Sequence, residues 1–96
     1  MKIEDFTLWA STYIKERNWT IPVTVYEEFV RVGVDWPGVK SYDNYSIQEI
    51  LDADTGPRIE MLKVTVKLNL ERLRVRLESL SQAEKMKQDI RKKLGG

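Results

Sequence analysis

The stretch that decides the fold spans residues 57–94 and reads PRIEMLKVTVKLNLERLRVRLESLSQAEKMKQDIRKKL. Its apolar residues recur at steps of seven, four, three, four and three, which is the spacing of a heptad seam. This seam consists of Ile59, Val66, Leu70, Leu73, Leu77 and Leu80, and it drifts near its end to Ala83, Met86, Ile90 and Leu94. We predict one long amphipathic helix over residues 57–94, with the seam as its principal contact with another helix or another chain.

The other side chains of this helix sort into bands, because each residue advances about 100° around the helix axis. A second apolar strip, opposite the seam, contains Met61, Val64, Leu68 and Val75. A basic stripe beside the seam contains Lys63, Lys67, Arg74, Lys85 and Lys92, and an acidic stripe next to it contains Glu60, Glu71, Glu78 and Asp89. A surface helix needs only one apolar strip. We therefore expect one strip to cover the rest of the chain and the other, or the C-terminal part of the helix, to meet a partner.

The same residues also permit a β-hairpin. Apolar and polar residues alternate from Leu62 to Leu70 and again from Leu73 to Leu77, as in two half-buried strands. However, residues 69–72 contain no glycine turn signal, and charge pairs such as Lys67 with Glu71 have the four-residue spacing of a helix. We favour the helix and keep an α+β fold with a hairpin near residues 62–77 as the alternative.

Short helices are predicted in the first part of the chain. Over residues 3–18, apolar residues at three- and four-residue steps share one helical face. They are Phe6, Trp9, Ala10, Tyr13 and Ile14. A second helix is expected to end near Val32, starting at Pro22 or at a capping box of Thr24 and Glu27. Residues 23–26, taken alone, equally fit a short strand.

Residues 33–45 show no sustained period and contain the turn signal Trp36-Pro37-Gly38, so we expect a loop there. Ser46 with Glu49 forms a capping box, which opens a short helix from Ile47 to about Ala53.

The tripeptide Asp54-Thr55-Gly56 resembles the one that carries the catalytic aspartate of aspartic proteases. Those enzymes place it after an apolar strand and usually follow it with a small residue. Here Asp52-Ala53 precedes it, Pro57 follows it, and a helical pattern begins. We interpret the tripeptide as a connection between two helices.

Charged and aromatic residues divide the 96-residue chain in two. Residues 1–55 carry five cationic and ten anionic side chains together with all nine aromatic residues, whereas the remainder carries eleven cations and five anions. With 42% apolar and 32% charged residues, the composition is typical of a globular domain. We predict a single, mainly α domain, in which residues 1–55 form an acidic, aromatic head and residues 57–94 form a long basic helix.

The chain contains no histidine and no cysteine. It therefore cannot build a histidine-dependent catalytic triad, a histidine- or thiolate-ligated zinc site, or a disulfide from its own residues. We expect no enzymatic activity, metal, cofactor or small-molecule substrate. The N-terminus reads MKIED, with acidic residues where a secretory signal requires a basic start, and no run of about 18 apolar residues follows. We expect a cytoplasmic protein with no membrane association.

The function that we predict is protein–protein interaction or assembly, as an adaptor, inhibitor or regulator. The chain would associate with itself, as in a coiled coil, or dock another protein through the long helix. A further candidate partner surface contains the flat side chains of Trp36, Tyr42 and Tyr45. The alternative is a small dimeric regulator that binds nucleic acid. Its phosphate contacts, weak and sensitive to salt, would come from Lys85, Arg91, Lys92 and Lys93.

Overall fold

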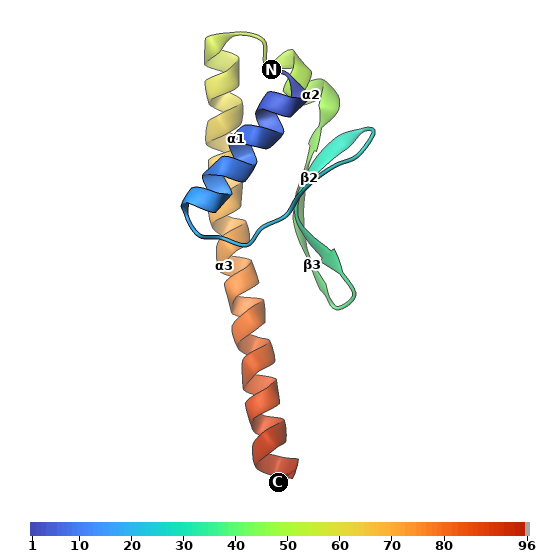
Figure 1. The fold of residues 1–96 in the computed structure, drawn as a ribbon, viewed down its shortest axis with the longest axis vertical. Helices are drawn as coiled ribbons and strands as arrows, with labels where there is room; N and C mark the ends of the chain where they lie inside the picture. Colours follow the sequence, from blue (N-terminus) through green and yellow to red (C-terminus); the bar gives the residue numbers. More distant parts are fainter. Residues whose placement is uncertain (96) are drawn as a thin grey trace.

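A computed structural model describes the backbone of residues 1–95 and the side chains of residues 1–80. Along the chain it contains α1 (Ile3–Glu16), β1 (Val23–Val25), β2 (Phe29–Trp36), β3 (Val39–Ser46), α2 (Ile47–Asp52) and α3 (Gly56–Gly95). The three strands form one antiparallel sheet in the order β1-β2-β3. Helices α1 and α3 lie together on one side of this sheet, and the C-terminal part of α3 extends beyond the rest of the chain (Figure 1).

The architecture is α+β, so the prediction of a mainly α fold is wrong. The alternative named the correct class but placed the hairpin at residues 62–77, which lie inside α3. The hairpin is instead formed by β2 and β3, where Val30, Val32 and Val34 point inward with the period of two that defines a strand. The helix was predicted because Phe29 and Val30 lie three and four residues after Tyr26. Over so short a segment, the apolar residues fit both the helical spacing and the period of two of a strand.

The predicted second helix up to Val32 is also wrong, and the strand reading of residues 23–26 is confirmed by β1. Strand β1 pairs antiparallel with β2, Val23 lying opposite Val32 and Val25 opposite Val30. The backbone N–H of Tyr26 donates to the carbonyl oxygen of Phe29 at 2.8 Å and closes the turn between them.

Residues 33–45, predicted to be a loop, form the second half of β2 and most of β3. The two strands pair without interruption from Phe29 opposite Ser46 to Trp36 opposite Val39. Only the turn itself was predicted correctly. Proline fixes the first turn position at Pro37, and Gly38 takes a positive φ of 86° at the second.

Gly33 shows why β2 requires a glycine in its middle. Its φ is 132°, and a Cβ atom at this position would overlap the carbonyl oxygen of Ser41 and the Cα of Tyr42 on β3. Its backbone N–H donates to the carbonyl oxygen of Pro22 at 2.9 Å. The close approach of the two strands therefore depends on the missing side chain.

The helices agree with the sequence patterns. Helix α1 ends at Glu16, shortly before Asn18, which adopts a left-handed φ of 59°. Ser46 caps α2 by accepting a 3.0 Å hydrogen bond at its Oγ from the backbone N–H of Glu49. Helix α3, Gly56–Gly95, confirms the predicted long helix.

The hydrophobic core lies between the sheet and the helices. Its largest fully buried side chains come from α1, β2, α2 and α3. They are Phe6, Ile50, Leu70, Val30, Val32 and Val66. The core therefore uses one face of α3 and one face of the sheet, and the opposite face of α3 is exposed over the side chains described up to residue 80.

Candidate interaction surface on helix α3

The seam of α3 is largely occupied by its own chain. Val66, Leu70 and Leu73 have exposed fractions of 2% or less and belong to the core. Ile59 and Leu77 are partly buried against that core. Leu80 is 38% exposed. The contact that the seam makes is thus mainly an intramolecular one, between α3 and the head.

The second apolar strip of α3 has no partner within the described side chains. Its members are all exposed: Met61 by 73%, Val64 by 52%, Leu68 by 60% and Val75 by 51%. We call these four residues the outer strip. At about 100° per residue, the centre of the outer strip lies about 170° around the axis from the centre of the seam. The head and the outer strip are therefore on opposite sides of α3.

Charges of opposite sign flank the outer strip. On one side lie Glu60, Glu71 and Glu78, which we call the acidic border, and on the other lie Arg58, Arg72 and Arg76, which we call the arginine border. All six residues are exposed. The acidic band was predicted from the sequence, whereas the arginine border was not. The sequence contains a signal for this border. Arg58, Arg72 and Arg76 are spaced by fourteen and four residues, which places all three on nearly the same side of a helix.

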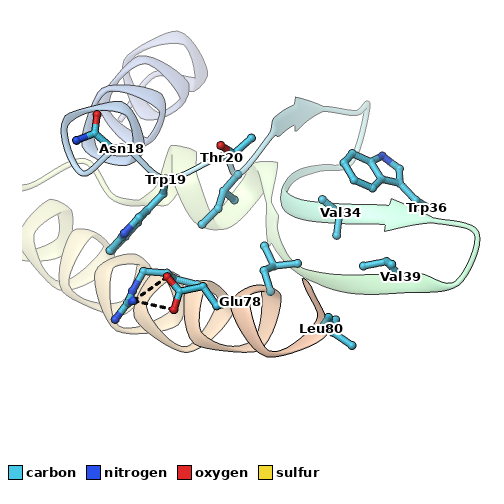
Figure 2. A pocket seen from close by; sticks show the side chains of 11 residues that line it. Asn18, Trp19, Thr20, Val34, Trp36, Val39, Glu78 and Leu80 are labelled. Atoms are coloured by element: carbon cyan, nitrogen blue, oxygen red, sulfur yellow. Dashed lines mark hydrogen bonds and ion pairs between the residues drawn. The ribbon is translucent and has the colours of Figure 1, made fainter. Parts of the chain in front are cut away.

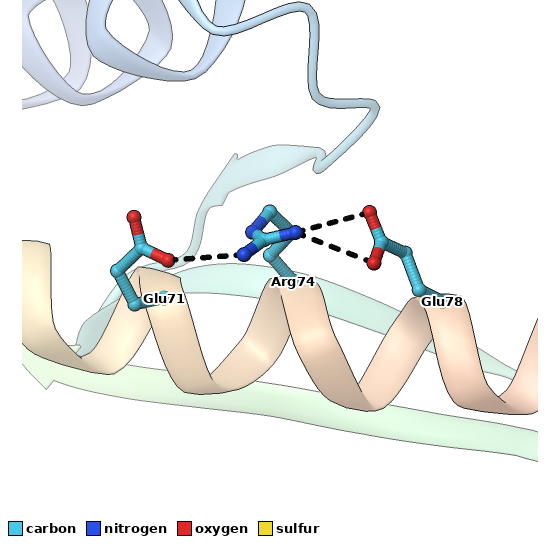
Figure 3. Close-up of polar contacts among 3 residues, drawn as sticks. All are labelled: Glu71, Arg74 and Glu78. Atoms are coloured by element: carbon cyan, nitrogen blue, oxygen red, sulfur yellow. Dashed lines mark hydrogen bonds and ion pairs between the residues drawn. The ribbon is translucent and has the colours of Figure 1, made fainter.

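Arg74 holds two carboxylates of the acidic border in place (Figure 3). Its Nη2 donates to Glu71 at 3.4 Å, and its Nη1 donates to both carboxylate oxygens of Glu78 at 3.2 and 3.3 Å. The side chains of Glu71 and Glu78 are still 51% and 61% exposed. They are oriented by Arg74 and remain open to further donors.

The three described members of the predicted basic stripe face aromatic rings of the same chain, and the other two, Lys85 and Lys92, lie outside the described side chains. The charged group of Lys63 lies 5.6 Å from the ring centroid of Trp9, that of Lys67 lies 5.7 Å from Tyr13, and that of Arg74 lies 5.5 Å from Trp19. Cations at this distance are attracted to the ring face. The stripe therefore helps to attach α3 to α1 and to the segment that follows it.

A groove of about 500 Å³ lies between the sheet, residues 18–21 and α3 (Figure 2). Its walls are mainly apolar, with Trp36 and Val39 at the hairpin and Leu77 and Leu80 on α3. Trp36 is 60% exposed. Two residues of the seam, Leu77 and Leu80, therefore line the groove rather than lying deep in the core.

The three aromatic residues predicted to form a partner surface are not brought together. Tyr45 is only 5% exposed, and Trp36 lies at the far end of the hairpin beside the groove. Tyr42 lies on the opposite face of the sheet, where its ring centroid is 4.0 Å from the guanidinium of Arg31. Burial raises the pKa of Tyr45 to about 12, against the smaller opposing effect of its hydrogen bond with Asn69. Tyr45 is thus part of the core.

Asp43 connects β3 electrostatically to the arginine border. Burial raises the pKa of its carboxyl group, and the positive charges of Arg76 and Arg72 on α3 oppose this effect. The raised value means that desolvation of the carboxylate outweighs the attraction of the two arginines.

Other predicted sites add no chemistry to this surface. Lys85, Arg91, Lys92 and Lys93, the predicted nucleic-acid contacts, lie outside the described side chains. Asp54 of the protease-like tripeptide lies between α2 and α3, and its carboxylate is 3.8 Å from Arg58. Among the side chains up to residue 80, no acidic cluster is placed to hold a metal ion. Within the described helices, none combines the length and apolar character needed to span a membrane.

Comparisons with protein-family models, with curated proteins and with solved structures gave no match to this chain.

Proposed function

We propose that this chain is a small cytoplasmic interaction or assembly protein, an adaptor, inhibitor or regulator rather than an enzyme, that docks an amphipathic helix on the outer strip of α3. The observation that carries the proposal is the exposure of all four apolar residues of the strip on the side away from the core. An apolar stripe along a helix ordinarily faces a core or a partner. The core of this chain already occupies the other side.

The two flanking borders support a helix as the docked element. Recognition between helices commonly combines an apolar stripe with charged residues on its sides, which fix partner and direction. The outer strip has this composition, with apolar residues three, four and seven positions apart between glutamates and arginines.

Photocrosslinking inside cells tests the proposal. A benzophenone amino acid replaces Val64 in the outer strip, or Leu8 on α1 as the control. Leu8 is also an apolar helix residue and is 69% exposed. We expect a covalent adduct at a helical segment from position 64 and none from position 8. Adding Leu68→Glu should remove the adduct, because a charge would then be buried in the contact. Equal adducts from both positions, or none from position 64, would contradict the proposal.

A further inference from the structure

We infer that the helix docked on the outer strip is α3 of a second copy of this chain, and that the two helices run parallel. This inference rests on the proposed function and adds the identity and the direction of the docked helix. The arrangement has a two-fold axis parallel to the helices, so the same strip is used by both copies.

The position of the outer strip makes this arrangement sterically open. The head packs against the opposite side of α3, and the C-terminal part of the helix extends beyond the head (Figure 1). Two copies related by the two-fold axis bring their outer strips together while their heads point away from each other. The outer strip runs from Met61 to Val75, so at 1.5 Å per residue it offers about 21 Å of length for such a contact.

The charges on the two borders favour the parallel direction. A rotation about an axis parallel to the helices places the acidic border of each copy against the arginine border of the other, on both sides of the contact. An antiparallel pair places each border against the same border of the second copy. Glutamates would then face glutamates and arginines would face arginines, which is destabilising.

The charged groups that this contact would pair are exposed on the surface of α3. Glu71 and Glu78 each contact Arg74 and are still more than half exposed, so their carboxylates can accept from a further donor. Arg72 and Arg76 are exposed, and their positive charges act on the carboxyl group of Asp43. The chain thus supplies both halves of a complementary contact, and a second copy satisfies it without any other partner.

Sedimentation equilibrium of the purified chain tests whether the partner is a second copy. We expect the mass of a dimer at high concentration and of a monomer on dilution. Leu68→Glu should raise the dimer dissociation constant about tenfold or more. The control Leu8→Glu places the same charge at an exposed leucine of α1 and should leave that constant unchanged. Circular dichroism establishes that both variants remain folded.

Single cysteines report the direction of the helices, because the chain has none of its own. Met61 and Val75 are fourteen residues apart, about 21 Å along the helix, whereas a disulfide requires Cα atoms within about 7 Å. In a parallel dimer, Met61→Cys alone and Val75→Cys alone should each give a disulfide-linked dimer, and a mixture should give no mixed species. In an antiparallel dimer centred on Leu68, the mixed species should dominate.

Charge reversal tests the role of the borders. The double variant Arg72→Glu with Arg76→Glu, and the double variant Glu71→Arg with Glu78→Arg, should each dimerise at least about tenfold more weakly than the parent. Mixing the two should restore a dimer. Equal dimerisation of all three chains would overturn the charge argument.

The outcomes separate this inference from the function on which it rests. A monomer at every concentration, together with an adduct from position 64 to another protein, overturns the second copy as partner and leaves helix docking intact. A dimer with mixed disulfides overturns the parallel direction alone. A monomer that gives no adduct from position 64 overturns both.

Discussion

The side-chain amide of Asn69 on α3 donates a 3.1 Å hydrogen bond to the hydroxyl oxygen of Tyr45 on β3. This bond lies at the boundary between helix and sheet, and Tyr45 also contacts Phe6 of α1, with ring centroids 5.8 Å apart. One tyrosine of β3 thus contacts both α1 and α3. Replacing it by phenylalanine keeps the ring and removes only the hydroxyl.

Tyr45→Phe should lower the free energy of unfolding by about 1 kcal/mol at pH 7, the typical net value of one hydrogen bond. Above pH 10 the difference should shrink. The folded-state pKa of Tyr45 is raised to about 12 from an ordinary value of 10, so between these values the folded chain keeps a proton that the unfolded chain releases. The parent therefore loses stability as pH rises from 10 to 12, and Tyr45→Phe does not share this loss. Denaturant unfolding of both chains from pH 7 to 12 measures the difference in their free energies of unfolding. If the free energies of unfolding of the two chains fell in parallel from pH 10 to 12, the raised pKa of Tyr45 would be contradicted.

Ser41 and Ser46 on β3 should respond in opposite directions to replacement by alanine. Ser41 is 2% exposed, and its Oγ has no hydrogen-bond partner. Removing this buried hydroxyl should raise the free energy of unfolding by about 1 kcal/mol. The hydroxyl of Ser46 caps α2, so Ser46→Ala should lower the free energy of unfolding by about 1 kcal/mol. Chemical denaturation of the two variants makes the comparison. A loss of stability in Ser41→Ala would indicate a partner for that hydroxyl.

Gly33→Ala should destabilise the sheet much more than Gly38→Ala. Both glycines have a positive φ, but a Cβ at Gly33 overlaps β3 whereas a Cβ at Gly38 meets nothing within 4 Å. We expect a cost above about 2 kcal/mol at Gly33, and a cost of about 1 kcal/mol at Gly38, from backbone strain alone. Thermal unfolding followed by circular dichroism measures both. Equal effects would mean that the strands can separate to admit the methyl group.

The three helices were predictable because their signals are local. A three-and-four-residue period and the capping pair Ser46 and Glu49 act within a few positions of each other. The β2–β3 hairpin was not, because β3 reads VKSYDNYS and carries few apolar residues of its own. Its pairing is decided by β2, by the Pro37-Gly38 turn and by the close approach at Gly33. These effects connect residues that a periodic pattern does not relate.

The two apolar strips of α3 were visible in the sequence, but which of them faces the head was not. Burial depends on where α1 and the sheet pack, and both strips have helical spacing. The seam contains more leucines, and Leu70 and Leu73 contribute to the core. The outer strip is interrupted at Glu71 and Arg72 and stays exposed. Its arginine border became evident only when the exposed side of the helix was known.

Leucines on the two sides of α3 should therefore differ in what they stabilise. Leu73 is 2% exposed, so Leu73→Ala should lower the free energy of unfolding by about 2 to 5 kcal/mol at any protein concentration. Leu68 is 60% exposed, so Leu68→Ala should change the free energy of unfolding by less than about 0.5 kcal/mol in dilute solution.

If the outer strip joins two copies, the unfolding midpoint of the parent rises with concentration, because association stabilises the folded chain. Leu68→Ala should make the unfolding midpoint depend less on protein concentration. Leu73→Ala should lower the midpoint at every protein concentration. Denaturation measured over a range of concentrations separates the two effects. A large loss from Leu68→Ala in dilute solution would instead place that residue in the core of its own chain.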